Sequence, residues 1–176
     1  GFASRLAVGQ PLGAFYGYRV DHIFQSQEEI NALDAALRLA TNSTTATYQS
    51  TLTRPGDIKF KDISGPNGVP DGKIDVYDQE IIGSAQAKFY GGITNTVRFM
   101  NFDFSAFLQY NVGNKVYNSS KGFTQGQSSV FSQDTDVLNR WTPTNTNTDI
   151  PRAVYGDPNQ NNRTSDRFLE DGSYAR

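Results

Sequence analysis

Cysteine is absent from the 176-residue chain, which excludes disulfide bonds, thiolate metal sites and a cysteine nucleophile. Histidine occurs once, as His22, so a metal site built from several histidines is excluded within this chain. The chain has 16 basic and 18 acidic residues, and the basic residues do not cluster into a block in the sequence. Nucleic acid is therefore not an expected partner. No run of about 18 apolar residues occurs, which excludes a membrane-spanning helix.

Catalytic motifs are also missing. No serine stands in a Gly-x-Ser-x-Gly sequence, and no glycine-rich phosphate-binding motif is present. The clustered aspartates lie in a single turn, whereas the two carboxylates of a glycosidase flank the scissile bond. We expect His22 to line one face of a strand rather than to act as a general base. The sequence therefore argues against an enzyme.

The chain is rich in aromatic residues and glycine. Aromatics make up 12% of the residues and glycines number 16, while only 36% of the residues are apolar. This balance favours β-structure with long polar loops over a helical bundle. We therefore expect an all-β fold with one or two short loop helices.

Two stretches in the first 61 residues predict strands. Residues 13–24 alternate, which places one set of side chains on the same side of an extended chain: Tyr16, Tyr18, Val20 and Phe24. Residues 57–61 predict a shorter strand, with Ile58 and Phe60 on one face and two lysines on the other.

A surface helix is predicted between these strands, over residues 27–40. Ser26 and Glu29 form a capping-box signature at its start. Its apolar residues make one narrow stripe that docks the helix on its neighbours: Ile30, Leu33 and Leu37.

The longest alternation predicts a hairpin formed by residues 89–99 and 102–110. Its apolar side chains share one face: Ile93, Val97, Phe99, Phe102, Phe104, Ala106, Leu108 and Tyr110. Polar side chains oppose them, except that Phe107 stands on the polar side: Thr94, Thr96, Arg98, Asp103, Ser105 and Gln109. Arms of about 10 residues cross a bilayer at a tilt, and a tight turn is usual on the inner side of an outer membrane. An antiparallel sheet on a soluble core shows the same alternation.

The chain after residue 118 is polar and rich in turn-forming residues. Residues 134–141 predict one or two helical turns before Pro143, and Trp141 is expected to anchor a loop. Such long irregular segments are unusual in compact soluble domains and normal for the outer loops of membrane barrels.

The acidic turn, residues 62–78, resembles a calcium-binding loop. Counting Asp71 as the fifth position of such a loop places Gly72 at the sixth, where the chain must bend sharply. The candidate oxygen ligands are Asp62, Ser64, Asp71, Lys73 through its carbonyl, Asp75 and Asp78. Asp62 and Ser64 take part only if residues 65–70 project as an insertion. The alternative is a solvated turn, because Asp, Gly and Pro favour turns for backbone reasons.

Several segments together resemble the SusC/RagA-type TonB-linked outer-membrane transporters. The first is Gly-Gln-Pro-Leu-Gly-Ala-Phe-Tyr-Gly-Tyr at residues 9–18, and the last is Ser-Asp-Arg-Phe-Leu-Glu-Asp-Gly-Ser-Tyr at residues 165–174. Between them, matching segments occur in order at residues 21–25, 55–62, 71–75, 81–84, 139–143 and 148–152. The insertion at residues 65–70 departs from the commonest form of the acidic turn, which puts strict calcium geometry in doubt.

The resemblance implies antiparallel strands of a large transmembrane β-barrel with long extracellular loops, of which residues 1–176 form part of the C-terminal region. It implies active import of oligosaccharides or peptides across the outer membrane, with energy delivered through TonB to a plug outside this sequence. A SusD-like surface lipoprotein is the implied partner. Apolar side chains of the strands would then contact outer-membrane lipid, and four tyrosines would lie near the membrane interfaces: Tyr16, Tyr18, Tyr90 and Tyr110.

We expect the chain to be an internal part of a longer protein. It starts at Gly1 without a signal-like segment, and its roughly four clear strands are fewer than the about 8 of a minimal barrel. The alternative function is a secreted calcium-binding β-domain that binds carbohydrate. The two hypotheses differ in what covers Phe102, Phe104 and Leu108, which is lipid in the first and a second layer of protein in the second.

Overall fold

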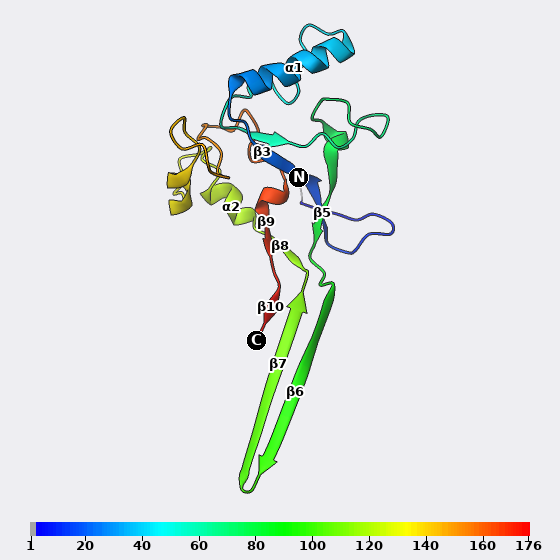
Figure 1. Cartoon of the computed structure of the whole chain (residues 1–176), viewed down its shortest axis with the longest axis vertical. Helices are drawn as coiled ribbons and strands as arrows, with labels where there is room; N and C mark the ends of the chain where they lie inside the picture. Colours follow the sequence, from blue (N-terminus) through cyan, green and yellow to red (C-terminus); the bar gives the residue numbers. More distant parts are fainter. Residues whose placement is uncertain (1–2) are drawn as a thin grey trace.

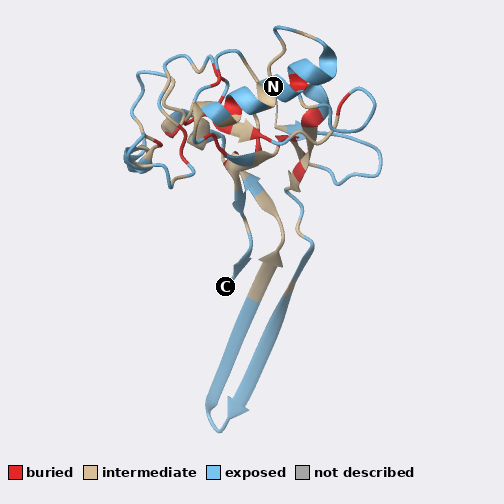
Figure 2. Ribbon diagram, turned by 45° about the horizontal axis from the view of Figure 1, so that its top comes forward, coloured by how far each residue is buried: buried red, intermediate tan, exposed pale blue. Residues whose placement is uncertain are grey.

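The computed structural model describes residues 3–176 and has two parts (Figure 1). The head, residues 3–84 and 115–171, consists of short strands, helices and loops. The hairpin, residues 89–112, projects from it as two long strands. Figure 2 shows that the buried residues gather in the head, while most of the hairpin is exposed. The head therefore has a core of its own, and the hairpin has none among the described residues.

Short antiparallel strands form three small sheets in the head. The first sheet has the order β1 (Ser4–Arg5), β2 (Ala14–Tyr18) and β5 (Gln79–Ser84). The second pairs β3 (Val20–Ile23) with β4 (Ile58–Phe60), and the third pairs β8 (Lys115–Tyr117) with β9 (Leu169–Asp171). The strand expected at residues 57–61 is confirmed as β4.

The single strand expected over residues 13–24 is wrong, because the chain changes partner at Arg19. β2 pairs with β5, while β3 pairs with β4 in a different sheet. The carbonyl of Arg19 accepts a hydrogen bond from the amide of Lys61 at 2.9 Å, and its guanidinium pairs with Glu80. The alternation is lost beyond this break, since Ile23 and Phe24 are adjacent and both buried.

The helix expected over residues 27–40 is confirmed as α1 (Gln27–Thr41). Ser26 Oγ accepts a hydrogen bond from the amide of Glu29 at 3.3 Å, but the Glu29 carboxylate accepts from Gln25 instead of closing the capping box on Ser26. The helix ends at Asn42, whose φ of 52° is left-handed. Across residues 3–176, no helix combines the length and the apolar character needed to cross a membrane.

The core of the head combines the helix stripe with the small sheets. Its buried members are Tyr18, Phe24, Ile30, Tyr48, Ile58, Phe60 and Ile74. The ring of Tyr18 lies 5.4 Å from that of Phe60, and the hydroxyl of Tyr48 donates to the carbonyl of Phe60 at 2.8 Å. The expectation that Tyr18 lies at a membrane interface is therefore wrong, because its ring is packed in this core.

The remaining elements are short. They are α2 (Ser119–Thr124), β10 (Tyr174–Ala175) and three 3-10 helices, η1 (Val76–Asp78), η2 (Thr135–Asn139) and η3 (Asp166–Phe168). The helical turns expected within residues 134–141 are confirmed as η2. The described chain is thus built mainly from strands with few helices, and it does not close into a barrel by itself.

Candidate functional site

The hairpin pairs β6 (Phe89–Phe99) with β7 (Phe102–Val112) in an unbroken antiparallel register of 11 residues each. Only Met100 and Asn101 connect the strands, with Met100 at a φ of 52°. The tight turn and the length of both arms are as the sequence predicts. Beside β7, the short β10 extends this sheet near the head (Figure 1).

The register divides the hairpin into two unlike faces, because successive side chains of a strand point to opposite sides. The apolar face carries Phe89, Ile93, Val97, Phe99, Phe102, Phe104, Ala106, Leu108 and Tyr110. Directly opposed pairs include Ile93 with Leu108 and Val97 with Phe104. These large side chains remain exposed, with Phe104 at 63% and Phe102 at 76%. Asn95, opposite Ala106, is an amide side chain in the middle of this otherwise apolar face. No described residue covers the face.

The polar face carries hydrogen-bonded and charged pairs across the same two strands. Arg98 and Asp103 form an ion pair at 3.1 Å, and the hydroxyls of Thr96 and Ser105 lie 3.3 Å apart. Phe107 lies on this face too, as the sequence predicts. Its position is explained by Gly92, because a Cβ at residue 92 would lie 2.7 Å from the Phe107 ring. The Phe107 ring therefore covers the backbone at Gly92, which has no side chain of its own.

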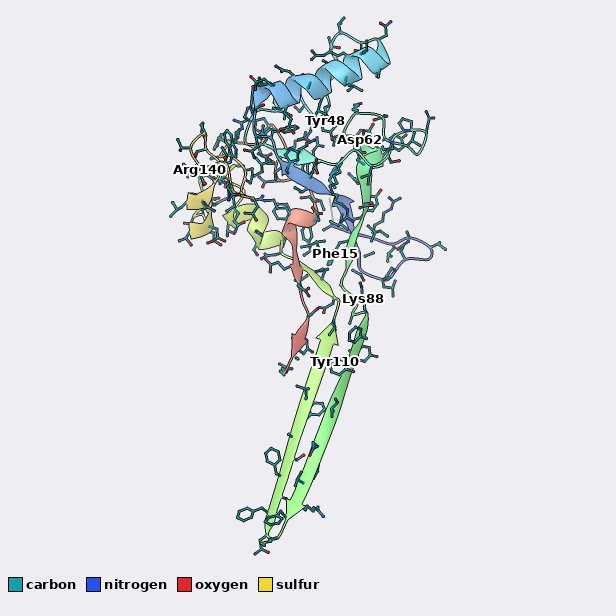
Figure 3. The ribbon with its side chains drawn as sticks, in the orientation of Figure 1. Phe15, Tyr48, Asp62, Lys88, Tyr110 and Arg140 are labelled. Carbon is teal, nitrogen blue, oxygen red and sulfur yellow. The ribbon has the colours of Figure 1, made fainter. Side chains whose placement is uncertain are left out.

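The apolar face has a matching arrangement at the neighbouring glycine. A Cβ at Gly91 would lie 2.6 Å from the hydroxyl oxygen of Tyr110, so the tyrosine side chain crosses the strand there. Figure 3 marks Tyr110 near the end of the hairpin that adjoins the head. The Tyr110 ring also meets that of Phe89 edge-on at 6.2 Å.

The acidic turn is held closed by its own aspartates. Asp62 accepts hydrogen bonds from the amides of Asp71 at 3.3 Å and Gly72 at 2.6 Å. The fully buried Asp78 carboxylate accepts from three amides, those of Ile63 at 2.9 Å, Ser64 at 3.2 Å and Asp75 at 2.7 Å. These bonds bring residues 62–64 back to residues 71–78. Of the insertion expected at residues 65–70, residues 66–70 are exposed and project, whereas Gly65 is buried against Asp71.

The other candidate ligands make local bonds. Asp71 accepts from the amide of Lys73 at 3.0 Å, and Asp75 accepts from the amide of Tyr77 at 2.9 Å and caps η1. Burial raises the pKa of Asp62, and the nearby Asp78 and Asp71 carboxylates raise it further against its backbone hydrogen bonds. The oxygen donors suit calcium chemically. In residues 3–176, however, no three His, Cys, Asp or Glu side chains converge to hold a metal ion, so calcium binding stays a prediction.

A second carboxylate site, not expected from the sequence, lies at Asp57. Its side chain is fully buried and accepts from Arg152 Nε at 2.7 Å and Nη2 at 3.1 Å. The side-chain amides of Asn159 and Asn161 donate to it as well, the second at 3.1 Å. Asn161 also accepts from the amide of Ile58 at 2.9 Å. This group, the Asp57 node, ties β4 to the loop at residues 150–163.

Trp141 completes the same junction. A Cβ at Gly56 would lie 2.4 Å from the indole ring, and Gly56 has a φ of 91° that favours glycine. The indole Nε1 donates to Gln25 Oε1 at 3.2 Å. Trp141 is 8% exposed, so the prediction that it anchors a loop is confirmed.

No family model matches the sequence. The chain is 32% identical over 171 residues to TonB-dependent receptor P3 of Formosa agariphila, which covers 97% of this chain and 15% of that receptor. It is 33% identical over 179 residues to TonB-dependent receptor P26 of the same organism, covering 98% of this chain and 16% of the receptor. The chain therefore spans about one sixth of the length of these relatives.

Solved structures show the same fold. A chain from the closed-closed state of the RagAB peptide importer matches all of this chain with a TM-score of 0.61, at 18% identity and over 17% of its own length. A chain of the RagAB peptide transporter matches 93% of this chain with a TM-score of 0.57, also at 18% identity and over 15% of its own length. The resemblance that the sequence predicts is confirmed: over nearly its whole length, this chain is homologous to a segment of TonB-dependent receptors, and it has the fold of a segment of a RagAB chain.

Proposed function

We propose that the chain is part of an outer-membrane transporter and that β6 and β7 are neighbouring strands of its transmembrane β-barrel. One observation carries this proposal, namely the continuous exposed apolar face opposite a polar one. Leaving side chains such as Phe104 and Leu108 in water forgoes about 1.5–3 kcal/mol each, whereas lipid covers them without any partner chain. The polar face, with Arg98, Asp103 and Ser105, would line a wet lumen.

The direction of the hairpin follows from its two ends. Tight turns face the inner side of an outer membrane and long loops face the outside. The two-residue turn at Met100 and Asn101 is therefore assigned to the periplasmic side. The head, with its long loops, is assigned to the extracellular side.

We further propose active import of oligosaccharides or peptides, driven through TonB and assisted by a SusD-like surface lipoprotein. The names of the similar proteins support the dependence on TonB and the import of peptides, since they are TonB-dependent receptors and a peptide importer. Oligosaccharides are included because the resemblance in sequence implies them. No step of this transport requires an enzymatic group in the chain. The barrel itself would be completed by parts of the protein outside residues 1–176.

Calcium binding at the acidic turn is a further part of the proposal. Burial, and after it the repulsion by the Asp78 and Asp71 carboxylates, raises the pKa of Asp62, and an ion bound at Asp62 and Asp71 would offset that repulsion. Its role would be to fix the turn that carries Ile74, a buried residue of the head core.

Two matched substitutions in the full-length protein test the membrane assignment. We expect Phe104→Arg to block outer-membrane assembly, because an arginine facing lipid near the midplane costs roughly 2–4 kcal/mol. Ser105→Arg, one residue further on the polar face, should assemble normally. Assembly is measured by membrane fractionation and by the shift of the band on heating before electrophoresis.

The opposite pattern of assembly in the two variants would reverse which face of the hairpin is assigned to lipid. Normal insertion of Phe104→Arg together with failure of Ser105→Arg would place lipid on the other face. A soluble protein without a heat-shifted band would favour the secreted calcium- and carbohydrate-binding domain instead.

A further inference from the structure

A basic residue without an acidic partner lies where residues 160–164 pack beside β2. The amide of Tyr18 donates to the carbonyl of Thr164 at 2.9 Å. A Cβ at Gly17 would lie 2.5 Å from that carbonyl oxygen, so a glycine is needed for this close approach. A cavity of about 320 Å³ lies at the junction, and its lining includes Tyr16, Tyr18, Gln79, Gln160, Arg163 and Thr164. Of the described residues that line it, only Arg163 carries a charge.

The Arg163 guanidinium is held in place by the core and by one hydrogen bond. Its Cζ lies 5.1 Å from the centre of the Tyr18 ring and 5.7 Å from that of Phe60, and both rings belong to the head core. Its Nε donates to Gln160 Oε1 at 2.5 Å. Gln160 has a φ of 62°, a left-handed conformation that is uncommon for a residue with a side chain. Such a conformation is retained where the surrounding structure requires it.

The two terminal nitrogens of Arg163 have no hydrogen-bond partner within residues 3–176. Nη1 is covered by the chain itself, whereas Nη2 is not. Because Arg163 lines the cavity, Nη2 is the charged donor that a group entering the cavity can reach.

The acidic residues of this part of the head are engaged elsewhere. Asp157 accepts from the amides of two asparagines at 2.8 and 3.0 Å. Glu80 and Asp166 both pair with Arg19, and no carboxylate of residues 3–176 forms an ion pair with Arg163. Burial lowers the pKa of Arg163, because the charged form is partly withdrawn from water. A charge in this setting is costly unless a counter-charge reaches it.

We propose that the cavity at Arg163 receives an acidic side chain from another segment of the same protein, outside residues 1–176. A carboxylate has two oxygens, and hydrogen bonds to it from a guanidinium are among the stronger ones in proteins. Arg163 Nη2 would donate to one oxygen, and the Tyr16 hydroxyl and the Gln79 amide, which line the same cavity, carry donors for the other. The chain spans about one sixth of the length of the receptors that it matches, so most of their length could supply the carboxylate.

The ion pair would fasten the head to the rest of the protein at this point. The inference needs only that the chain is part of a longer protein. It holds whichever face of the hairpin contacts lipid, so it can fail without the transporter assignment failing.

Zero-length cross-linking in the full-length protein tests the inference. Arg163→Lys places an amine at the cavity, and a carbodiimide joins an amine to a carboxylate in contact with it as an amide, the reagent taking up the water that is released. Mass spectrometry of the digested protein identifies the joined peptides. We expect a new cross-link from position 163 to an aspartate or glutamate of the same protein outside residues 1–176. Arg54→Lys, at an exposed arginine that donates to two carbonyls, is the control and should gain none.

Every other cross-linking result overturns the proposal. A cross-link from position 163 to a copurified lipoprotein or to an added peptide would assign the cavity to a different partner. A cross-link within residues 3–176, or no cross-link, would mean that no outside segment reaches Arg163. If Arg163→Lys does not assemble, Gln79→Lys brings the amine to the same cavity.

Exchange of the two charges then tests the pair itself. Arg163→Glu should lower the temperature at which the band loses its heat-shifted form, because two carboxylates would face each other. Arginine in place of the cross-linked acid should restore that temperature in the double variant. A double variant no more stable than Arg163→Glu alone would contradict the ion pair.

Discussion

Asp57 shows how one buried residue organises the head. Its carboxylate is completely enclosed, yet it accepts five hydrogen bonds, from the amide of Arg54 and from the side chains of Arg152, Asn159 and Asn161. A buried charge is tolerated only when it is paired and fully hydrogen-bonded. The Asp57 node therefore depends on every partner at once.

Asp57→Ala is expected to open the head, because it leaves the Arg152 guanidinium and two buried amides without their acceptor. Breaking a buried pair in this way costs about 3–5 kcal/mol. Limited proteolysis of the full-length protein should then cleave residues 150–163 about 150- to 4000-fold faster, since cleavage follows the open population. Asp171→Ala, at an exposed ion pair with Lys115, is the control and should leave the rate unchanged. Equal rates for both variants would contradict the structural role of the node.

The raised pKa of Asp62 predicts how the stability of the head changes with pH. Its raised pKa means that the folded chain binds the proton more tightly than the unfolded chain. Its contribution to stability is therefore full below the ordinary pKa of about 3.9 and is lost as pH rises through the raised value. Thermal unfolding of the head, followed by proteolysis at a series of temperatures, should show this loss, and Asp62→Asn should remove this loss of stability.

At neutral pH, calcium should raise the unfolding temperature of the unmodified protein. No effect of calcium would leave the acidic turn without an ion.

In the hairpin, the positions of two aromatic side chains are explained by two glycines. Two glycines stand in β6, and each is covered by an aromatic side chain from β7 on its own face. Glycine in a strand weakens it, and a ring lying across the bare backbone restores contact. Phe107 on the polar face is therefore explained by Gly92, a relation that alternation alone does not reveal.

Gly92→Val tests this pairing. The new side chain would meet the Phe107 ring, and such overpacking costs about 1–3 kcal/mol. We expect the temperature at which the band loses its heat-shifted form to fall. The double variant Gly92→Val with Phe107→Ala should recover most of the loss. If the single variant is as stable as the unmodified protein, the ring does not depend on the glycine.

Elements with a local pattern were predictable from the sequence, and long-range ones were not. The helix α1 and the hairpin follow from periodicity and capping within a few residues. The break at Arg19 depends on Lys61 and Glu80, which are distant in the sequence, so alternation continued across it and predicted one strand. The spacing of the acidic turn predicted oxygen ligands for calcium, but it did not predict that Asp62 and Asp78 close the turn by accepting hydrogen bonds from backbone amides. The Asp57 node had no signal, because its partners stand about a hundred residues away in a polar loop.

At the scale of the whole molecule, the head presents exposed apolar side chains within residues 130–138, at Val130 and Phe131 in a loop and at Leu138 in η2. Exposed apolar groups in proximity mark interaction surfaces. We expect the detergent-extracted full-length protein to copurify with a surface lipoprotein, and Phe131→Asp to weaken the association. Leu39→Asp, at a similarly exposed position on α1, is the control. Copurification that is equally weak in both variants would argue against the 130–138 loop as the contact.

The Asp57 node also sets an order of events during folding. Asp57 and Arg152 are 95 residues apart, and the whole hairpin lies between them in the chain. Contacts of such separation form only after the entropy of closing the intervening loop has been overcome, which makes them slow. The Asp57 node therefore closes only after the segment between its members, which includes the whole hairpin, has been brought back to the head. We expect the β6–β7 pairing, whose partners begin with the neighbours Phe99 and Phe102, to form before the contact between Asp57 and Arg152.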